Sequence, residues 1–221
     1  MNALTKIAKE AGLTVLIDGA HAPGVIDIDV KAIGADFYTG NLHKWCFCPK
    51  GSAFLWCNPE IVTDLFPQPT VISSTGYYDL IGRYAYTGTR DYTAFYAVPN
   101  AIDFINNKLG GFRQMQNYNK SLLKLGCDIL VREWNTSLLV PASMTAFMSN
   151  VILPIQNNEH CSILQKRLFD ENKISMVYGQ VLSQEGTQIY YTRISAQVYL
   201  SLNDFILLAS NVKRILLELQ S

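Results

Sequence analysis

Charged residues are scarce in this sequence, and neither sign dominates. Only 16% of the 221 residues are charged, and 18 basic residues balance 18 acidic ones, whereas about 25% is usual in globular proteins. Without net charge, the chain lacks the attraction that draws proteins to nucleic acid or anionic lipid. It also lacks an apolar run approaching the roughly 20 residues that span a bilayer. We therefore expect no nucleic-acid partner and no membrane partner.

Cysteine is limited to five residues, an odd count, and the opening stretch of residues 1–12 resembles an amphipathic helix more than a signal peptide. This predicts reduced thiols and a cytoplasmic location. A small metal module around His43, Cys46, Cys48 and Cys57 is an alternative. The spacing of these residues fits no common zinc motif, so we expect buried free thiols and no metal.

Hydrophobic residues are plentiful, at 49%, and include 12 Tyr and 10 Phe. Such a composition excludes extensive disorder, and the length allows one large domain or two modest ones. A chain with so little charge and so many aromatic residues is expected to have surface that a partner covers.

The first half of the sequence alternates helices and strands. Helices are predicted at residues 2–11, 29–33 and 58–65, and strands at residues 13–17, 35–39 and 51–57. The strand at 13–17 is a continuous apolar run, typical of a strand buried on both faces of a mostly parallel sheet. Two longer helices follow at 93–108 and 112–134, separated by a pair of glycines.

The second half has a different pattern, with strands predicted at 146–153, 174–182 and 187–195 and helices at 161–171 and 204–219. Two neighbouring strands joined by a short turn favour an antiparallel sheet. We therefore predict an α/β domain at residues 1–109 and a small α+β domain at residues 110–221.

Asp18 and Lys44 each follow the end of a predicted strand, which is where open α/β sheets bind ligands. Taken alone, Asp18 is as easily a turn former, and Lys44 is a surface residue. Lys44 stands among aromatic and apolar residues, a setting that favours an uncharged amine able to condense with an aldehyde. Together, an acid and such a lysine are what pyridoxal phosphate needs: the acid holds its ring nitrogen protonated and the lysine holds its aldehyde carbon.

Several motifs around these two residues resemble the class V aminotransferase family of fold-type I pyridoxal-phosphate enzymes. They are DGAHAPG, GADFYTGNLHKW and CPKGSAFL, with YTGTRDYTAFYAVPNAIDF and TRISAQVYLSLNDF further on. The branch they resemble contains isopenicillin-N epimerase-like and cysteine desulfhydrase-like proteins. The resemblance implies an aspartate-aminotransferase-like fold, with residues 1–109 forming the C-terminal part of the cofactor-binding large domain.

The resemblance also implies a role for each matching residue. Lys44 would be the catalytic residue, forming the Schiff base and then moving the substrate α-proton. Asp18 would contact the pyridine nitrogen and His21 the phenolic oxygen. The other implied contacts are Asn41 and His43 near the phosphate, Gly88 and Thr89 at the phosphate of a neighbouring subunit, and Arg193 on the substrate carboxylate.

The family's large domain contains an upstream phosphate-binding turn that this sequence does not show before Asp18. We therefore expect a fragment or short form, acting on a small amino acid within a homodimer or beside a full-length relative. The alternative is an inactive chain that serves only as an oligomerisation partner. Because no cysteine lies between Phe169 and Arg193, a lyase or epimerase-like reaction is favoured over persulfide transfer.

Overall fold

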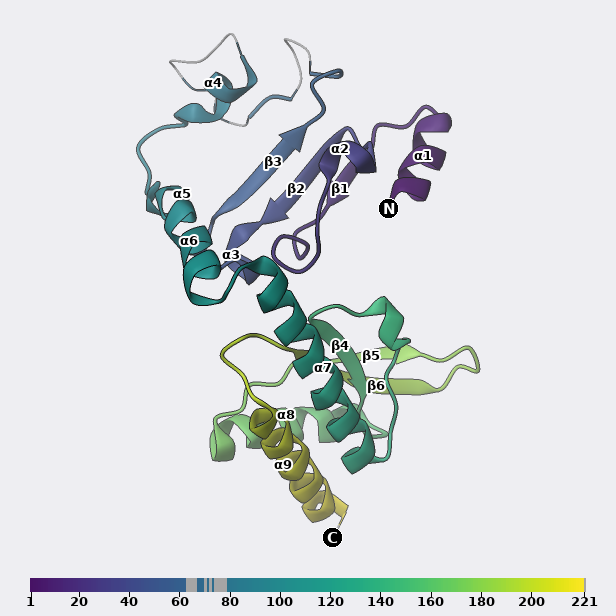
Figure 1. The fold of residues 1–221 in the computed structure, drawn as a ribbon. Helices are drawn as coiled ribbons and strands as arrows, with labels where there is room; N and C mark the ends of the chain where they lie inside the picture. The colour runs from purple at the N-terminus through teal and green to yellow at the C-terminus, as the bar shows by residue number, and fades with distance from the viewer. Residues whose placement is uncertain (63–66, 70, 72, 74–78, 221) are drawn as a thin grey trace. The chain divides into compact units, whose positions relative to one another are not determined.

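The computed structural model describes residues 1–62, 67–69, 71, 73 and 79–220 (Figure 1). The chain divides into two compact units, Met1–Phe112 and Arg113–Ser221. Each unit has a three-stranded sheet of its own. The division falls three residues after the boundary predicted from the sequence.

The sheet of unit 1 contains the strands that end near Asp18 and Lys44. Strand β1 (Leu16–Asp18) pairs in parallel with β2 (Phe37–Asn41), and β2 pairs antiparallel with β3 (Ala53–Cys57). The order is β1-β2-β3, with Asp18 opposite Thr39. Because β1 and β2 run in the same direction, their carboxyl ends lie at one edge of the sheet.

Six helices are described in unit 1: α1 (Asn2–Glu10), α2 (Val30–Ile33), α3 (Leu42–Trp45), α4 (Leu80–Ala85), α5 (Thr93–Tyr96) and α6 (Val98–Lys108). Helix α2 begins where Asp29 accepts hydrogen bonds from the N–H groups of Lys31 and Ala32, and it ends at Gly34, whose φ is +74°. The sequence analysis missed α3 and α4, and it joined α5 and α6 into one helix.

The helix predicted at residues 58–65 is absent from the part that the structure describes. Residues 59–61 form a turn, in which Asn58 Oδ1 accepts a hydrogen bond from Glu60 N at 3.1 Å. The asparagine that was expected to cap a helix caps this turn instead. Residues 63–65 of that prediction lie outside the described residues.

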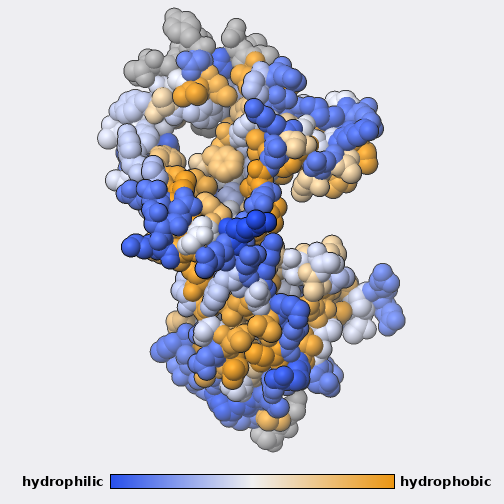
Figure 2. All heavy atoms as spheres, viewed as in Figure 1, coloured by the Kyte–Doolittle hydropathy of each residue, from blue (hydrophilic) through white to orange (hydrophobic). Residues whose placement is uncertain are grey.

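Among the described residues of unit 1, one buried cluster consists of Ile17, Ala35 and Tyr38. The prediction that β1 is buried on both faces is wrong in this chain: Leu16 is 61% exposed, and only Ile17 of this strand is buried. On α1, Leu4 and Ile7 are exposed while Thr5 is buried. Figure 2 shows hydrophobic side chains at the surface around these elements.

Unit 2 has the antiparallel sheet that the sequence predicted. It consists of β4 (Met148–Ile152), β5 (Tyr178–Leu182) and β6 (Gln188–Ser195), in the order β4-β6-β5. The helices are α7 (Phe112–Trp134), α8 (Asn158–Asn172) and α9 (Leu202–Gln220), with a short 3₁₀ turn at Ala142–Met144.

A large buried cluster of unit 2 joins its three helices to the sheet. Leu130 of α7, Leu164 of α8, Ile215 of α9 and Val151 of β4 all belong to one buried cluster and are fully buried. Trp134 Nε1 of α7 also donates a hydrogen bond to Ala209 O of α9, at 3.2 Å. None of the helices described in either unit is long and apolar enough to cross a membrane.

Candidate active site

Asp18 ends β1 with its side chain exposed. Its Oδ1 accepts a hydrogen bond from Ala20 N at 2.9 Å, which holds the carboxylate at the start of the following turn. Burial raises the pKa of Tyr38, and the nearby charge of Asp18 raises it further. The Tyr38 ring fills the space beside Gly19, where a Cβ would lie 2.1 Å from Tyr38 Oη. Only glycine fits there, so the turn stays close to the sheet.

Lys44 lies in α3, a single turn that begins directly after β2. Because β1 and β2 are parallel, the helix that contains Lys44 begins at the same edge of the sheet at which Asp18 ends β1. The apolar setting expected for Lys44 is not found in this chain, because its side chain is exposed. Within the described part of the chain, no hydrogen bond or ion pair engages its amine. The amine is therefore available to a ligand at this edge.

His21 is tied to α3 by a hydrogen bond that the sequence analysis did not foresee. Trp45 Nε1 donates to His21 Nδ1 at 3.2 Å. The Trp45 side chain is buried, whereas His21 is exposed. The turn after Asp18 and the helix that contains Lys44 are thus directly joined. In the sequence, the only signal for this hydrogen bond was the position of Trp45 next to Lys44.

Asn41 and His43 flank the start of α3, and both are half-buried. Asn41 occupies the N-cap position, but its side chain makes no capping hydrogen bond there. His43 Nδ1 lies 2.9 Å from Ser52 O, a carbonyl that also accepts hydrogen bonds from the backbone N–H groups of Leu42 and His43. Ser52, which the sequence analysis did not single out, thereby fixes α3 against the start of β3.

Ser52 also connects this edge to α5. It is fully buried, and its Oγ lies 2.8 Å from Ala94 O. The segment before α5 contains Gly88 and Thr89, whose hydrogen bonds are to nearby residues of the same segment. Tyr92 Oη donates to Gly88 O at 2.9 Å, and Thr89 Oγ1 lies 3.3 Å from Tyr86 Oη. The structure does not bring Gly88 and Thr89 into contact with Asp18 or Lys44.

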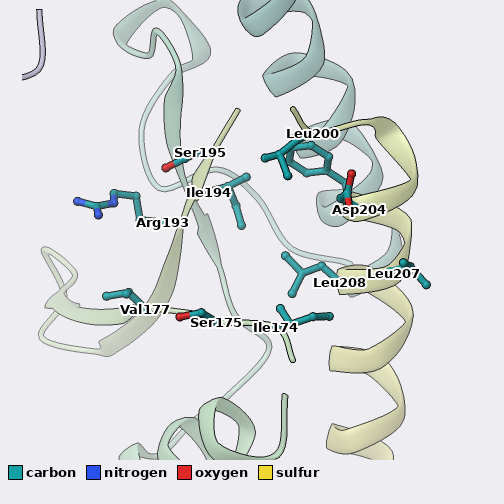
Figure 3. Close-up of a pocket in the computed structure, with 11 residues that line it drawn as sticks. Ile174, Ser175, Val177, Arg193, Ile194, Ser195, Leu200, Asp204, Leu207 and Leu208 are labelled. Carbon is teal, nitrogen blue, oxygen red and sulfur yellow. The ribbon is translucent and has the colours of Figure 1, made fainter. Parts of the chain in front are cut away.

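Arg193 lies on β6 in unit 2, with its side chain exposed. It borders a cavity of about 410 Å³ whose lining is otherwise mostly apolar, including Ile174, Leu200, Phe205 and Leu208. In Figure 3, the Arg193 side chain points away from the labelled leucines. Its guanidinium is therefore presented at the surface of unit 2, where it can bind a carboxylate.

The cysteines near Lys44 are buried free thiols, as the sequence predicted; they are Cys46, Cys48 and Cys57. Burial, with a smaller contribution from Cys48, raises the pKa of Cys46 to about 11. Among the residues that the structure describes, no group of three or more His, Cys, Asp or Glu side chains could hold a metal ion. The metal-module alternative therefore gains no support.

The residues at this edge fit the chemistry that pyridoxal phosphate requires. An exposed carboxylate ends β1, and an exposed, unengaged amine follows β2. A carboxylate can pair with a protonated ring nitrogen, and an amine can condense with an aldehyde. Two further polar groups lie at the same edge. The Asn41 amide is at the start of α3, and the His21 ring is hydrogen-bonded to Trp45 of α3.

Solved structures support the same fold. The chain superposes on a cysteine desulfurase from Thermococcus onnurineus NA1 with a TM-score of 0.73 at 20% identity, covering 97% of this chain and 55% of that one. For the cysteine desulfurase CsdA from Escherichia coli, the TM-score is 0.71 at 19% identity, covering 97% and 54%. The fold is that of fold-type I pyridoxal-phosphate enzymes. The chain covers about half of the length of these structural neighbours.

Curated relatives are more similar in sequence. A probable chloroplastic L-cysteine desulfhydrase of Arabidopsis thaliana is 36% identical over 218 residues, which cover 91% of this chain and 44% of that protein. Isopenicillin N epimerase of Streptomyces clavuligerus is 35% identical over 115 residues, covering 46% of this chain and 29% of that protein. The chain thus spans less than half the length of these relatives.

The family model for class V aminotransferases matches residues 1–205, which include every candidate site residue named above. That family depends on pyridoxal phosphate. The chain is a member of the class V aminotransferase family, related to cysteine desulfhydrases and isopenicillin N epimerases.

Proposed function

We propose that this chain binds pyridoxal phosphate at the edge formed by β1 and β2 and acts on a small amino acid as a desulfhydrase-like lyase. The observation that carries the proposal is the parallel pairing of β1 and β2, which places Asp18 and the Lys44 helix at the same sheet edge. When bound, the cofactor supplies an aldehyde and an electron-accepting ring.

Each residue at the edge then has a defined task. The Asp18 carboxylate would accept a hydrogen bond from the protonated ring nitrogen, and its negative charge would keep that proton in place. The Lys44 amine would hold the cofactor aldehyde and, when free, would accept the proton from the substrate α-carbon. For Arg193, an exposed residue of unit 2, the family resemblance implies a contact with the substrate carboxylate, which its guanidinium could hold through two parallel N–H groups. In a desulfhydrase-like reaction, the electron pair left on the α-carbon would form a Cα=Cβ double bond while the Cβ–S bond breaks and sulfur leaves as hydrosulfide.

An epimerase-like reaction is the closest competitor for the same site. It begins with the same proton transfer to Lys44 but returns a proton to the opposite face of the α-carbon, for which a second base is needed. The desulfhydrase-like outcome is favoured because similarity to the desulfhydrase extends over 91% of this chain, against 46% for the epimerase. Incubation with L-cysteine and assays for sulfide and D-cysteine distinguish the two.

Cofactor binding is tested by adding pyridoxal phosphate to the purified chain and recording the yellow absorbance of the lysine-linked cofactor. We expect it in the native chain and in Lys50→Ala, a matched control that removes an exposed lysine from the turn that follows α3. Lys44→Ala should abolish it. No yellow absorbance in the native chain would refute binding by this chain, and absorbance retained in Lys44→Ala would refute the assignment of Lys44.

A second candidate is a non-catalytic oligomerisation partner of a full-length relative. The exposure of Leu16 on β1 (61%) and of Leu55 on β3 (44%) favours it, because these are the edge strands of the unit 1 sheet. Sheets with parallel strands are normally covered on both faces. Light scattering tests this: association with a full-length class V protein, without cofactor absorbance in this chain, would support the second candidate. A cofactor-binding homodimer would support the first.

A further inference from the structure

The hydrogen bond between Trp45 and His21 fixes which nitrogen of the His21 ring carries the proton. Trp45 Nε1 lies 3.2 Å from His21 Nδ1. An indole N–H can only donate, so His21 Nδ1 must accept and is unprotonated. The neutral imidazole therefore carries its single N–H at Nε2.

The contact is held in place from both sides. Trp45 is only 7% exposed, and its ring centroid lies 6.2 Å from that of His21 with an interplanar angle of 58°. The turn that contains His21 packs on the end of α3 at Gly24, where a Cβ would lie 3.3 Å from Trp45 O and 3.0 Å from Cys46 Sγ. The backbone at Trp45 is therefore packed directly against the turn that contains His21.

His43, two residues before Trp45, is held in the opposite tautomer to His21. Its Nδ1 lies 2.9 Å from Ser52 O, and a carbonyl oxygen can only accept. The His43 ring therefore carries its proton at Nδ1 when neutral. The two histidines of the site are thus held in opposite tautomers by two different neighbours, an indole N–H and a carbonyl.

We propose that Trp45 is a positioning residue that keeps His21 in its Nε2–H tautomer. A ligand bound beside Asp18 and Lys44 then meets a hydrogen-bond donor at His21 instead of an acceptor. The inference rests on the proposed function and on the family resemblance, which implies that His21 contacts the phenolic oxygen of the cofactor ring. Since Trp45 follows Lys44 in α3, this single turn of helix positions the Lys44 amine and also orients the His21 N–H donor.

The tautomer can be read directly from long-range ¹H–¹⁵N spectra of the 221-residue chain without cofactor. The chain has 3 His, and His21→Gln and His160→Gln assign their signals. We expect the Nε2–H pattern for His21 and the Nδ1–H pattern for His43 in the same spectrum. An Nδ1–H pattern at His21 in the native chain would overturn the proposal, whatever any variant does.

Trp45→Phe removes the indole N–H while keeping an aromatic ring, and His21 should then populate both tautomers. Trp134→Phe is the matched control, since Trp134 is also buried and also donates one hydrogen bond, but within unit 2. It should leave the His21 pattern unchanged. An unchanged pattern in a folded Trp45→Phe chain, or the same change in Trp134→Phe, would contradict the specific role of Trp45.

Titration with pyridoxal phosphate separates this inference from the proposed function. Only the Nε2–H tautomer can donate to the cofactor, so equal tautomer populations in Trp45→Phe should weaken cofactor binding about twofold, with no change in Trp134→Phe. If the native chain binds no cofactor, the proposed function fails while the tautomer result stands. If it binds and Trp45→Phe matches the native chain in both affinity and tautomer, the positioning role fails and the proposed function stands.

Discussion

The Lys9 amine of α1 and the Asp36 carboxylate before β2 form an ion pair, and Asp36 Oδ2 also accepts a hydrogen bond from Val15 N at 2.8 Å. The Asp36 side chain is only 5% exposed, whereas Lys9 is 39% exposed. One buried carboxylate thus joins α1 to the segments that lead into β1 and β2. This ion pair positions α1, because the exposed Leu4 and Ile7 show that its apolar residues are not packed inside unit 1.

Asp36→Ala should destabilise the chain by about 2 kcal/mol, because it leaves the Val15 N–H without its acceptor in a buried place. Urea unfolding at neutral pH measures the change. The control is Lys6→Ala, which removes the other ion pair of α1, with Glu10; its side chains are 76% and 64% exposed. That change should alter stability by less than about 0.5 kcal/mol. Equal effects would show that the buried pair does not hold α1.

The same carboxylate should make stability depend on acidic pH. Burial raises the pKa of Asp36, but the hydrogen bonds from Lys9 and Val15 and the charge of Lys9 outweigh it, so the pKa lies below its usual value. Its stabilising contribution is therefore complete above the unfolded pKa, about 4, and is lost as pH falls through the lower folded value. Asp36→Asn should flatten the stability profile in this range. A profile as steep as that of the native chain would contradict this.

Gly126 of α7 is needed because Phe205 of α9 lies against it. A Cβ at Gly126 would lie 2.4 Å from Phe205 Cδ1. Gly126→Ala gains about 1 kcal/mol of helix propensity, but crowding in a packed core costs about 1–3 kcal/mol, so we expect a net loss near 1 kcal/mol in urea unfolding. Ser121→Ala, at an exposed position of the same helix, should not destabilise. Recovery of stability in Gly126→Ala/Phe205→Leu would locate the clash, and its absence would argue against it.

All five cysteines are buried, so the native chain should resist alkylation. Burial, the largest cause, raises the pKa of Cys46, Cys127 and Cys161 to about 11 in each case. At pH 8, thiolate is therefore rare as well as inaccessible. Mass spectrometry after iodoacetamide should show little labelling in the native chain and five labels after unfolding in urea. Rapid labelling of Cys46 under native conditions would show that the end of α3 opens readily.

The sequence predicted the strands of both units and the closing helix because periodicity and turn residues are local signals. It predicted all three strands of unit 2 within a few residues, and its short strand at residues 35–39 overlaps β2. It missed α3 because a single turn of four residues has no periodicity to detect. It placed a helix at residues 58–65 because an Asn-Pro pair is compatible with both a helix start and the turn observed at residues 59–61.

The candidate site was only partly predictable for a different reason. Asp18 and Lys44 could be singled out because each follows a strand, and their motifs resemble a family. Trp45 and Ser52 could not, because their importance lies in contacts with His21 and His43 that depend on tertiary packing. The exposure of Leu16 was also unpredictable, since an apolar run does not reveal which neighbours will cover it.

Glu171 of α8 joins this helix to Arg214 of α9, and it also pairs with Arg167 of its own helix. Its carboxylate accepts hydrogen bonds from Arg167 Nε at 2.5 Å and from Arg214 Nη2 at 2.8 Å. These two bonds lower the pKa of Glu171 to about 2. Its contribution to stability is thus present above the usual glutamate pKa and is lost as pH falls toward 2.

Glu171→Gln should therefore lower the Tm by about 2 °C at neutral pH and low salt, and by less in high salt, because ions screen exposed charges. Thermal unfolding followed by circular dichroism measures both. Asp170→Asn is the matched control, since Asp170 pairs only with Lys166 on the same helix among the ion pairs described. It should change the Tm less, because an ion pair within one helix does not hold α9 against α8. Equal losses in the two variants, or a loss in Glu171→Gln that salt does not reduce, would show that this network does not join the helices electrostatically.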